Sequence, residues 1–315
     1  MYSTIMQSVY QHPELMILDG SSNYNEEGTM PLKVYFDCYP CLLRQVLDAV
    51  HYLELDEEIT KVILNQSMHD LMTMEDDLTS SEMAAQIHQR VIQNGGGADP
   101  YQNVKRLSLK KALEQCEYAK NLILQSNDPL ETALKMCTAG NIIDFGPASD
   151  FDLKTALDQA LEMPFSHFDY KEFKSAVEHA ERILFLADNA GETVFDRLLI
   201  EQINKPMDYV VKSAPIMNDA LREDAQLTGF PDYVTIMENG TAIQGTVLSH
   251  CSEEFLKKYA MADLIIAKGM ANFETLPNEG GRAFFLLKIK CKPIATLSGI
   301  PFQSFVVKRG GLLSP

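Results

Sequence analysis

The sequence lacks any apolar run of the roughly 18 residues that a membrane span requires, and its N-terminus lacks the basic-then-apolar order of a secretory signal. Positive charge is also scarce. The 27 lysines and arginines are outnumbered by 44 aspartates and glutamates, which gives a formal net charge of −17. Nucleic acids and anionic membranes are bound through basic surfaces, so we expect neither as a partner. A small phosphorylated substrate remains compatible with this charge, because a local cation can reverse the field inside one pocket.

Without a secretion signal, the six cysteines indicate reduced thiols in a cytoplasmic protein. Cys38 and Cys41 stand three apart at a predicted helix start, a placement that lowers thiol pKa and suits redox chemistry or metal binding. A second Cys-x-x-Cys pair, which would complete a four-ligand zinc site, is missing from the sequence, and Cys291 is the candidate third thiol. We predict that these three sulfurs lie close together. The alternative is that all three are small buried hydrophobes.

Three segments differ in their patterning. Residues 1–29 are polar and aperiodic and are interpreted as an N-terminal extension, while residues 30–140 carry apolar residues mostly at helical spacing. Residues 141–315 contain short β-prone runs that alternate with helical stretches, which predicts an α/β domain with a mostly parallel sheet and helices on both faces. The expected strands are 183–187, 209–211, 233–237, 264–267, 294–297 and 305–307, and 284–289 is either strand or helix. The sequence carries no signal for an oligomeric state.

Polar residues follow two of the expected strands. The run 183–187 stops at Asp188-Asn189, and Asp219 follows the next strand along the chain. Ligands of open α/β sheets bind just past the carboxyl ends of the strands, and an acid, an amide and a second acid offer the oxygen donors that a hard divalent cation prefers. We therefore predict a metal site at Asp188, Asn189 and Asp219. The alternative is that these residues cap helices, for which Asp and Asn are also favoured.

Two further stretches are candidates for the same pocket. Lys268 ends the expected strand 264–267 beside Gly269, where an ammonium group can meet a phosphate oxygen and the glycine permits close backbone approach. Asn141 lies in the stretch Gly140-Asn141-Ile142-Ile143-Asp144-Phe145-Gly146, whose small residues suggest a tight pocket loop. The alternatives are a surface lysine before a turn and an ordinary turn.

Taken together, these motifs resemble the metal-dependent damage-control phosphatases, also called the acidic-residue-methyltransferase-like domain. The resemblance runs from about Met30 to Arg309 and rests on the order of the motifs. They are Asp-Cys-Tyr-Pro-Cys, Gly-Asn-Ile-Ile-Asp-Phe-Gly, Asp-Asn-Ala-Gly-Glu, the Asn218-Asp219 pair, Lys-Gly-Met-Ala-Asn-Phe-Glu-Thr-Leu and Lys290-Cys291. The paired cysteines and the Lys-Cys element resemble the prokaryotic branch of that family.

The resemblance implies hydrolysis of phosphate esters of small metabolites, such as sugar phosphates, with one divalent ion (Mn, Ni, Co or Mg). It places Asp188, Asn189 and Asp219 at the metal, and Asn141, Glu192 and Lys268 at the phosphate. Asn272 and Glu274 belong to the same substrate-binding motif. Glu192 is expected to orient a water or accept its proton, and Lys268 to offset phosphate charge.

Other functions remain as alternatives. A haloacid-dehalogenase-type phosphatase needs a second aspartate two residues after Asp188, where this chain has Ala190. An S-adenosylmethionine-dependent carboxyl methyltransferase, an activity credited to one branch of the family, needs a glycine-rich loop, and the stretch Asp188 to Glu192 contains only Gly191. A non-enzymatic thiol module for metal or redox binding, centred on Cys38 and Cys41, is the third alternative.

Overall fold

The computed structural model describes residues 34–74, 78–140 and 153–312. The chain divides into two units, residues 1–32 and 33–315, and all of the described residues belong to the second. The predicted division into residues 1–29, 30–140 and 141–315 stays a prediction. Among the described residues, none of the helices combines the length and the apolar character that crossing a membrane would need.

Three helices, α2 (Cys38–Tyr52), α3 (Glu57–Thr73) and α4 (Ser80–Asn94), form a bundle at the start of the described chain. Helix starts are set by polar caps. Asp56 accepts from the Ile59 N–H at 2.8 Å before α3, and Thr79 and Glu82 form a reciprocal capping box before α4. The apolar faces of the three helices pack together around Val46, Ile63 and Ile87, with Tyr101 at the edge of this cluster.

The remaining elements build a seven-stranded sheet with its covering helices. The helices are α5 (Gln102–Gln125), α6 (Pro129–Ala139), α7 (Leu153–Glu162), α8 (Tyr170–His179), α9 (Thr193–Ile203), α10 (Arg222–Thr228), α11 (Glu253–Met261), α12 (Gly269–Thr275) and α13 (Lys292–Ser298), with 3₁₀ turns η3 (Ala190–Glu192) and η4 (Leu248–His250). The strands are β1 (Phe165–Phe168), β2 (Ile183–Leu186), β3 (Met207–Val211), β4 (Val234–Glu238), β5 (Leu264–Lys268), β6 (Ala283–Lys288) and β7 (Phe305–Arg309).

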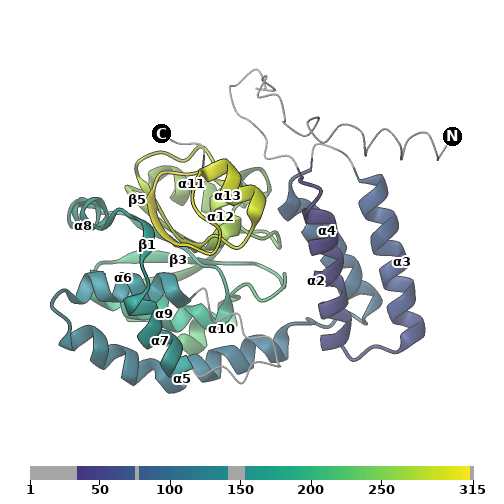
Figure 1. Cartoon of the computed structure of the whole chain (residues 1–315), viewed down its shortest axis with the longest axis horizontal. Helices are drawn as coiled ribbons and strands as arrows, with labels where there is room; N and C mark the ends of the chain where they lie inside the picture. Colours follow the sequence, from purple (N-terminus) through teal and green to yellow (C-terminus); the bar gives the residue numbers. More distant parts are fainter. Residues whose placement is uncertain (1–33, 75–77, 141–152, 313–315) are drawn as a thin grey trace, which may run out of the picture. The chain divides into compact units, whose positions relative to one another are not determined.

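The sheet has the order β1-β7-β6-β5-β2-β3-β4, and all neighbouring pairs are parallel except β6 with β7. Helices α5, α6, α7 and α9 cover one face, and α11, α12 and α13 lie on the other (Figure 1). The central strands are buried on both faces and are therefore largely apolar, as in Ile183–Leu186 and in Leu264–Lys268 up to its last residue, Lys268. The predicted α/β class, with a mostly parallel sheet, helices on both faces and a helical N-terminal part, is confirmed.

The order of the strands fixes where a ligand site is expected. From β2 the chain moves outward through β3 to β4 and then returns to place β5 on the other side of β2. The order in which strands are added to the sheet therefore reverses between the parallel strands β2 and β5, and such switch points leave a crevice at the carboxyl ends of the strands. Asp188 follows β2, and Lys268 ends β5.

One expectation about an individual element fails, and one strand was not expected. Residues 294–297, expected as a strand, belong to helix α13, which has Pro293 in its first turn and Gly299 as its C-cap with a φ of 67°. A run of four residues, three of them apolar, does not distinguish strand from helix, and the flanking proline and glycine were the usable signal. Strand β1 was not anticipated, and the ambiguous run 284–289 is largely the strand β6.

Candidate active site

The loops after β2 and β3 hold the three predicted metal ligands side by side. Asn189 and Asp219 form an isolated antiparallel bridge, and the Ala220 N–H donates to the Asp188 carbonyl at 2.8 Å. None of the three side chains caps a helix: Asn189 precedes η3 without a side-chain capping bond, and the cap positions of α9 and α10 are Glu192 and Leu221. The helix-capping alternative is therefore wrong for these residues.

The two carboxyl groups lie in a poorly solvated, acidic environment. Burial, followed by the nearby negative charges of Glu192 and Asp219, raises the pKa of Asp188 well above its ordinary value. Burial also raises the pKa of Asp219 to about 6, although Lys212 opposes this shift. Oδ1 of Asp219 is buried and has no hydrogen-bond partner among the described residues. An orphaned carboxylate oxygen beside a second carboxylate and an amide is a donor set that fits a hard divalent cation.

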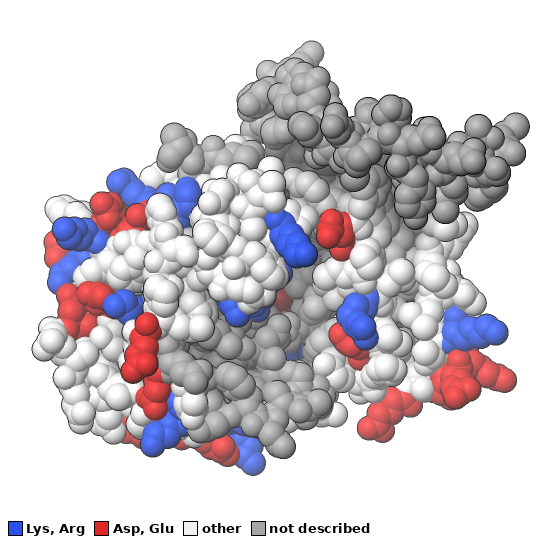
Figure 2. Space-filling view, viewed as in Figure 1, with Lys and Arg blue, Asp and Glu red and all other residues white. Residues whose placement is uncertain are grey.

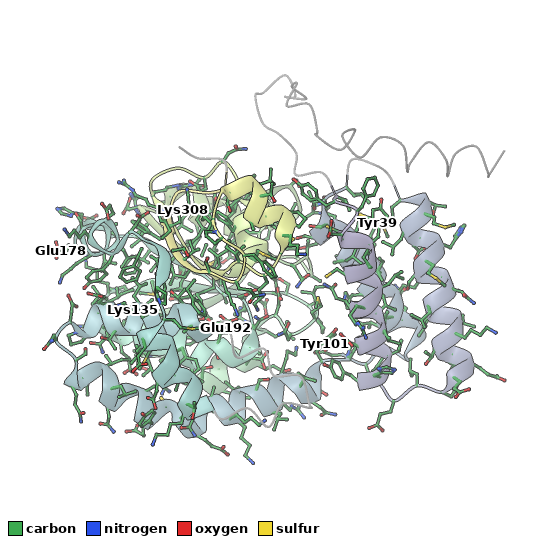
Figure 3. The ribbon with its side chains drawn as sticks, viewed as in Figure 1. Tyr39, Tyr101, Lys135, Glu178, Glu192 and Lys308 are labelled. Atoms are coloured by element: carbon green, nitrogen blue, oxygen red, sulfur yellow. The ribbon has the colours of Figure 1, made fainter. Side chains whose placement is uncertain are left out.

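Beneath these ligands lies a buried ion-pair network. Lys268 Nζ lies 2.6 Å from Glu192 Oε2 and 2.8 Å from Asp196 Oδ1, and all three side chains are about 1% exposed or less. The other Glu192 oxygen, Oε1, accepts from Asn189 Nδ2 at 2.6 Å. Glu192 lies in the interior of the α/β part (Figure 3). Because the nitrogen of the Asn189 amide is committed to Glu192, the amide oxygen is left as the ligand atom.

Asp196 completes this network and was not anticipated. Its Oδ1 accepts from Lys268, and its Oδ2 accepts from the Tyr209 hydroxyl at 2.7 Å. Asp196 stands one helical turn after Glu192, and this i,i+4 spacing on one face was a signal that could have identified it. The alternative interpretation of Lys268 as a surface lysine before a turn is wrong, because its side chain is fully buried. Its predicted contact with phosphate stays a prediction.

Gly269 permits the close approach of Asp188 to the end of β5. Its φ is 81°, and a Cβ built there would lie 2.0 Å from Asp188 Oδ2. The neighbouring Asn272 is almost fully buried and bonds within the protein: its Nδ2 donates to the Lys268 carbonyl at 2.7 Å, and its Oδ1 accepts from Thr246 Oγ1 at 2.7 Å. These bonds fix the turn that carries Gly269, and the predicted role of Asn272 in substrate binding stays a prediction.

A cavity of about 520 Å³ opens from the metal ligands toward the helical bundle. Asp188 and Asn189 line it, together with Cys38, Cys41, Glu274 and Cys291. Burial raises the pKa of Glu274 to about 7, and the Ser80 hydroxyl donates to its Oε2 at 3.3 Å. A second cavity, of about 370 Å³, lies at the amino ends of the strands beside Arg182 and Asp208 and contains none of the predicted site residues.

The three thiols line one cavity, although Cys291 is about 250 residues away from Cys38 and Cys41 in the sequence. The expectation that the helix start lowers the thiol pKa is wrong. Burial, reinforced by nearby Glu274, raises the pKa of Cys38 to about 11, and burial raises those of Cys41 and Cys291 as well. Within residues 34–74, 78–140 and 153–312, no group of three or more His, Cys, Asp or Glu side chains is arranged to hold a metal. The proposed cation site differs in having an amide as one of its three ligands.

Asn141 lies outside the described residues. Lys212 was not predicted as a site residue, although it directly follows β3, just as Lys268 is the last residue of β5. Its Nζ lies 3.7 Å from Asp219 Oδ2. On the face shown in Figure 2, acidic and basic side chains are interspersed.

Comparisons with known proteins identify the family of the chain. The profile of the damage-control phosphatase ARMT1-like domain matches residues 34–304. A damage-control phosphatase of Pyrococcus horikoshii is 32% identical over 285 residues, covering 88% of this chain and 98% of that protein. A damage-control phosphatase of Archaeoglobus fulgidus is 31% identical over 286 residues, covering 86% and 97%. The crystal structure of a DUF89 family protein from P. horikoshii superimposes with a TM-score of 0.82 at 30% identity, covering 89% of this chain and 99% of that one.

Proposed function

Because the chain belongs to the damage-control phosphatase ARMT1-like family, we propose that it is a metal-dependent phosphatase acting on phosphate esters of small, damaged metabolites such as sugar phosphates. The observation that carries the proposal is the set of Asp188, Asn189 and Asp219 at the switch point of the sheet, with one Asp219 oxygen buried and without a hydrogen-bond partner among the described residues. The adjoining cavity of about 520 Å³ has room for a small phosphorylated molecule.

Asp188, Asn189 and Asp219 would hold one divalent cation, with Mn, Ni, Co and Mg as the candidates. Such an ion supplies charge stabilisation for a phosphoryl group and lowers the pKa of a bound water. The fit is chemical, since two carboxylates and an amide are hard oxygen ligands.

The chain's own residues prepare the site. Glu192 orients the Asn189 amide, and Lys268 compensates the charge of Glu192 and Asp196. Lys290 lines the cavity, and its positive charge lowers the pKa of Asp188. We therefore assign to Lys290 the initial contact with the phosphate of an entering substrate. Proton transfer by Glu192 and direct stabilisation of the transition state by Lys268 are further parts of the proposal.

Glu274, which lines the same cavity, is suited to bind the part of the substrate that carries the phosphate. Its pKa of about 7 leaves it partly protonated near neutral pH, so it can both donate a hydrogen bond to a hydroxyl group and accept one. Ser80 offers a second hydroxyl beside it. A polyhydroxylated leaving group such as a sugar matches these two partners.

The test is a phosphatase assay of the full chain with a panel of phosphorylated sugars and cofactor fragments, in metal-free buffer and then with each of the four metals. We expect turnover only with metal, and its loss by at least about 10²-fold in Asp219→Asn, because one charged ligand is removed. Asp208→Asn is the matched control, since Asp208 pairs with Lys258 beside the cavity at the amino ends of the strands. Turnover in metal-free buffer, or an equal loss in both variants, would contradict the proposal.

A further inference from the structure

Gln244 reaches the candidate metal site from a loop that contains none of the predicted site residues. The loop joins β4 to η4, and Gln244 lines the cavity together with Asp188 and Asn189. Its amide lies near enough to Asp219 to lower the pKa of that carboxyl group by hydrogen bonding, against the larger effect of burial. A carboxylate only accepts hydrogen bonds, so the Gln244 amide nitrogen is the donor in this contact.

The residues after Gln244 are locked onto helix α12. Gly245 has a φ of 71°, and a Cβ built there would lie 2.4 Å from the Ala271 carbonyl oxygen, so only glycine fits this approach. The Thr246 N–H donates to Thr275 Oγ1 at 2.8 Å, and Thr246 Oγ1 donates to Asn272 Oδ1 at 2.7 Å. The backbone that presents Gln244 is therefore fixed relative to the end of β5.

Lys212 ties the same loop to the candidate metal ligand. Its ammonium group donates to the Gly245 carbonyl and lies 3.7 Å from Asp219 Oδ2, and the side chain is only 5% exposed. Lys212 thus holds the loop and the carboxylate at a fixed separation. The contacts of this loop with α12 and with Lys212 therefore hold the Gln244 amide beside Asp219.

We propose that Gln244 recognises the phosphoryl group: one N–H of its amide donates to Asp219, and the other donates to a non-bridging phosphoryl oxygen. A glutamine amide carries two N–H donors, so the same nitrogen serves a metal ligand and the substrate at once. A neutral donor also suits this place, because it attracts a phosphate without competing with the cation for Asp219. The assignment rests on the proposed phosphatase function.

The test measures two binding constants on the full-length protein: Mn²⁺ affinity from the electron paramagnetic resonance of free Mn²⁺, and inorganic phosphate affinity by calorimetry at saturating Mn²⁺. For Gln244→Leu we expect phosphate to bind about tenfold more weakly or worse, as for a lost hydrogen bond to a charged group. Mn²⁺ affinity should stay within about threefold, because all three ligands remain. For Gln244→Glu we expect a phosphate loss on the order of a hundredfold from like-charge repulsion, with Mn²⁺ bound at least as tightly.

Gln45→Leu is the matched control, because Gln45 lines the same cavity from α2, where its amide donates to Cys41. Its phosphate affinity should remain within about twofold of the wild type. Equal phosphate binding in the wild type and Gln244→Leu overturns the proposal, as does a parallel loss of Mn²⁺ and phosphate or an equal effect in Gln45→Leu. A wild type that binds Mn²⁺ but not phosphate instead refutes the phosphatase function, and the role of Gln244 with it.

Discussion

Replacing Gly269 by alanine should weaken metal binding while leaving the fold in place. A Cβ at this position would lie 2.0 Å from Oδ2 and 2.3 Å from Cγ of Asp188. Non-bonded carbon and oxygen atoms need at least about 3 Å, so the Asp188 carboxylate must retreat by about 1 Å. A misplacement of this size at a catalytic group costs on the order of 10²-fold in rate.

The same substitution also strains the backbone, and this effect has to be separated from the displacement of Asp188. An alanine at a φ of 81° costs about 1–2 kcal/mol. Gly96 is a matched control, since its φ is 83° and a Cβ there would meet no atom within 4 Å. Gly96→Ala should therefore lose a similar amount of stability and retain full metal binding.

The assay combines denaturant unfolding of both variants with Mn²⁺ titration and phosphatase turnover. We expect comparable losses of unfolding free energy, but weakened Mn²⁺ binding and a turnover loss of about 10²-fold in Gly269→Ala alone. If Gly269→Ala bound Mn²⁺ and turned over substrate like the wild type, the placement of Asp188 against this turn would be refuted. Equal functional losses in both variants would refute it as well.

Two further predictions concern buried charge. Lys268→Met should lower the free energy of unfolding by about 3–5 kcal/mol, because it leaves the buried carboxylates of Glu192 and Asp196 without a positive partner. Adding Asp196→Asn should restore part of this loss. A loss below about 1 kcal/mol in chemical denaturation would contradict the network. Burial lowers the pKa of His88 from 6.5 to about 4, so the unfolded chain binds the extra proton and stability falls as pH drops through this window. The loss by pH 4.5 is about 2–3 kcal/mol, and His88→Gln should remove it in unfolding curves recorded at pH 7 and 4.5, whereas an unchanged pH dependence would contradict this assignment.

The core of the site could be predicted from local sequence because it follows a general property of parallel sheets. Asp188 and Asn189 end a continuously apolar run, and Asp219 follows the next strand, so the carboxyl ends of neighbouring strands bring them together. The strands were recognisable in the sequence because burial on both faces makes each run short, apolar and sharply bounded.

The remaining features depend on tertiary contacts that a local pattern does not encode. The thiol pKa shift of Cys38 went against expectation because burial by the rest of the fold outweighs the effect of the helix start. Gln244 reaches Asp219 only through the packing of its loop on α12. The strand expected at residues 294–297 is a helix, since so short an apolar run fits either element and the position of Pro293 decides.

The central claim is that Asp188, Asn189 and Asp219 bind one divalent cation. It is tested most directly by anomalous diffraction from crystals of the full chain grown with Mn²⁺. The account predicts one strong peak within about 2.5 Å of oxygen atoms from all three side chains, and no comparable peak at the thiols of Cys38, Cys41 and Cys291. A peak at the thiols, or no peak at Asp188 and Asp219 in a crystal of active enzyme, would contradict it.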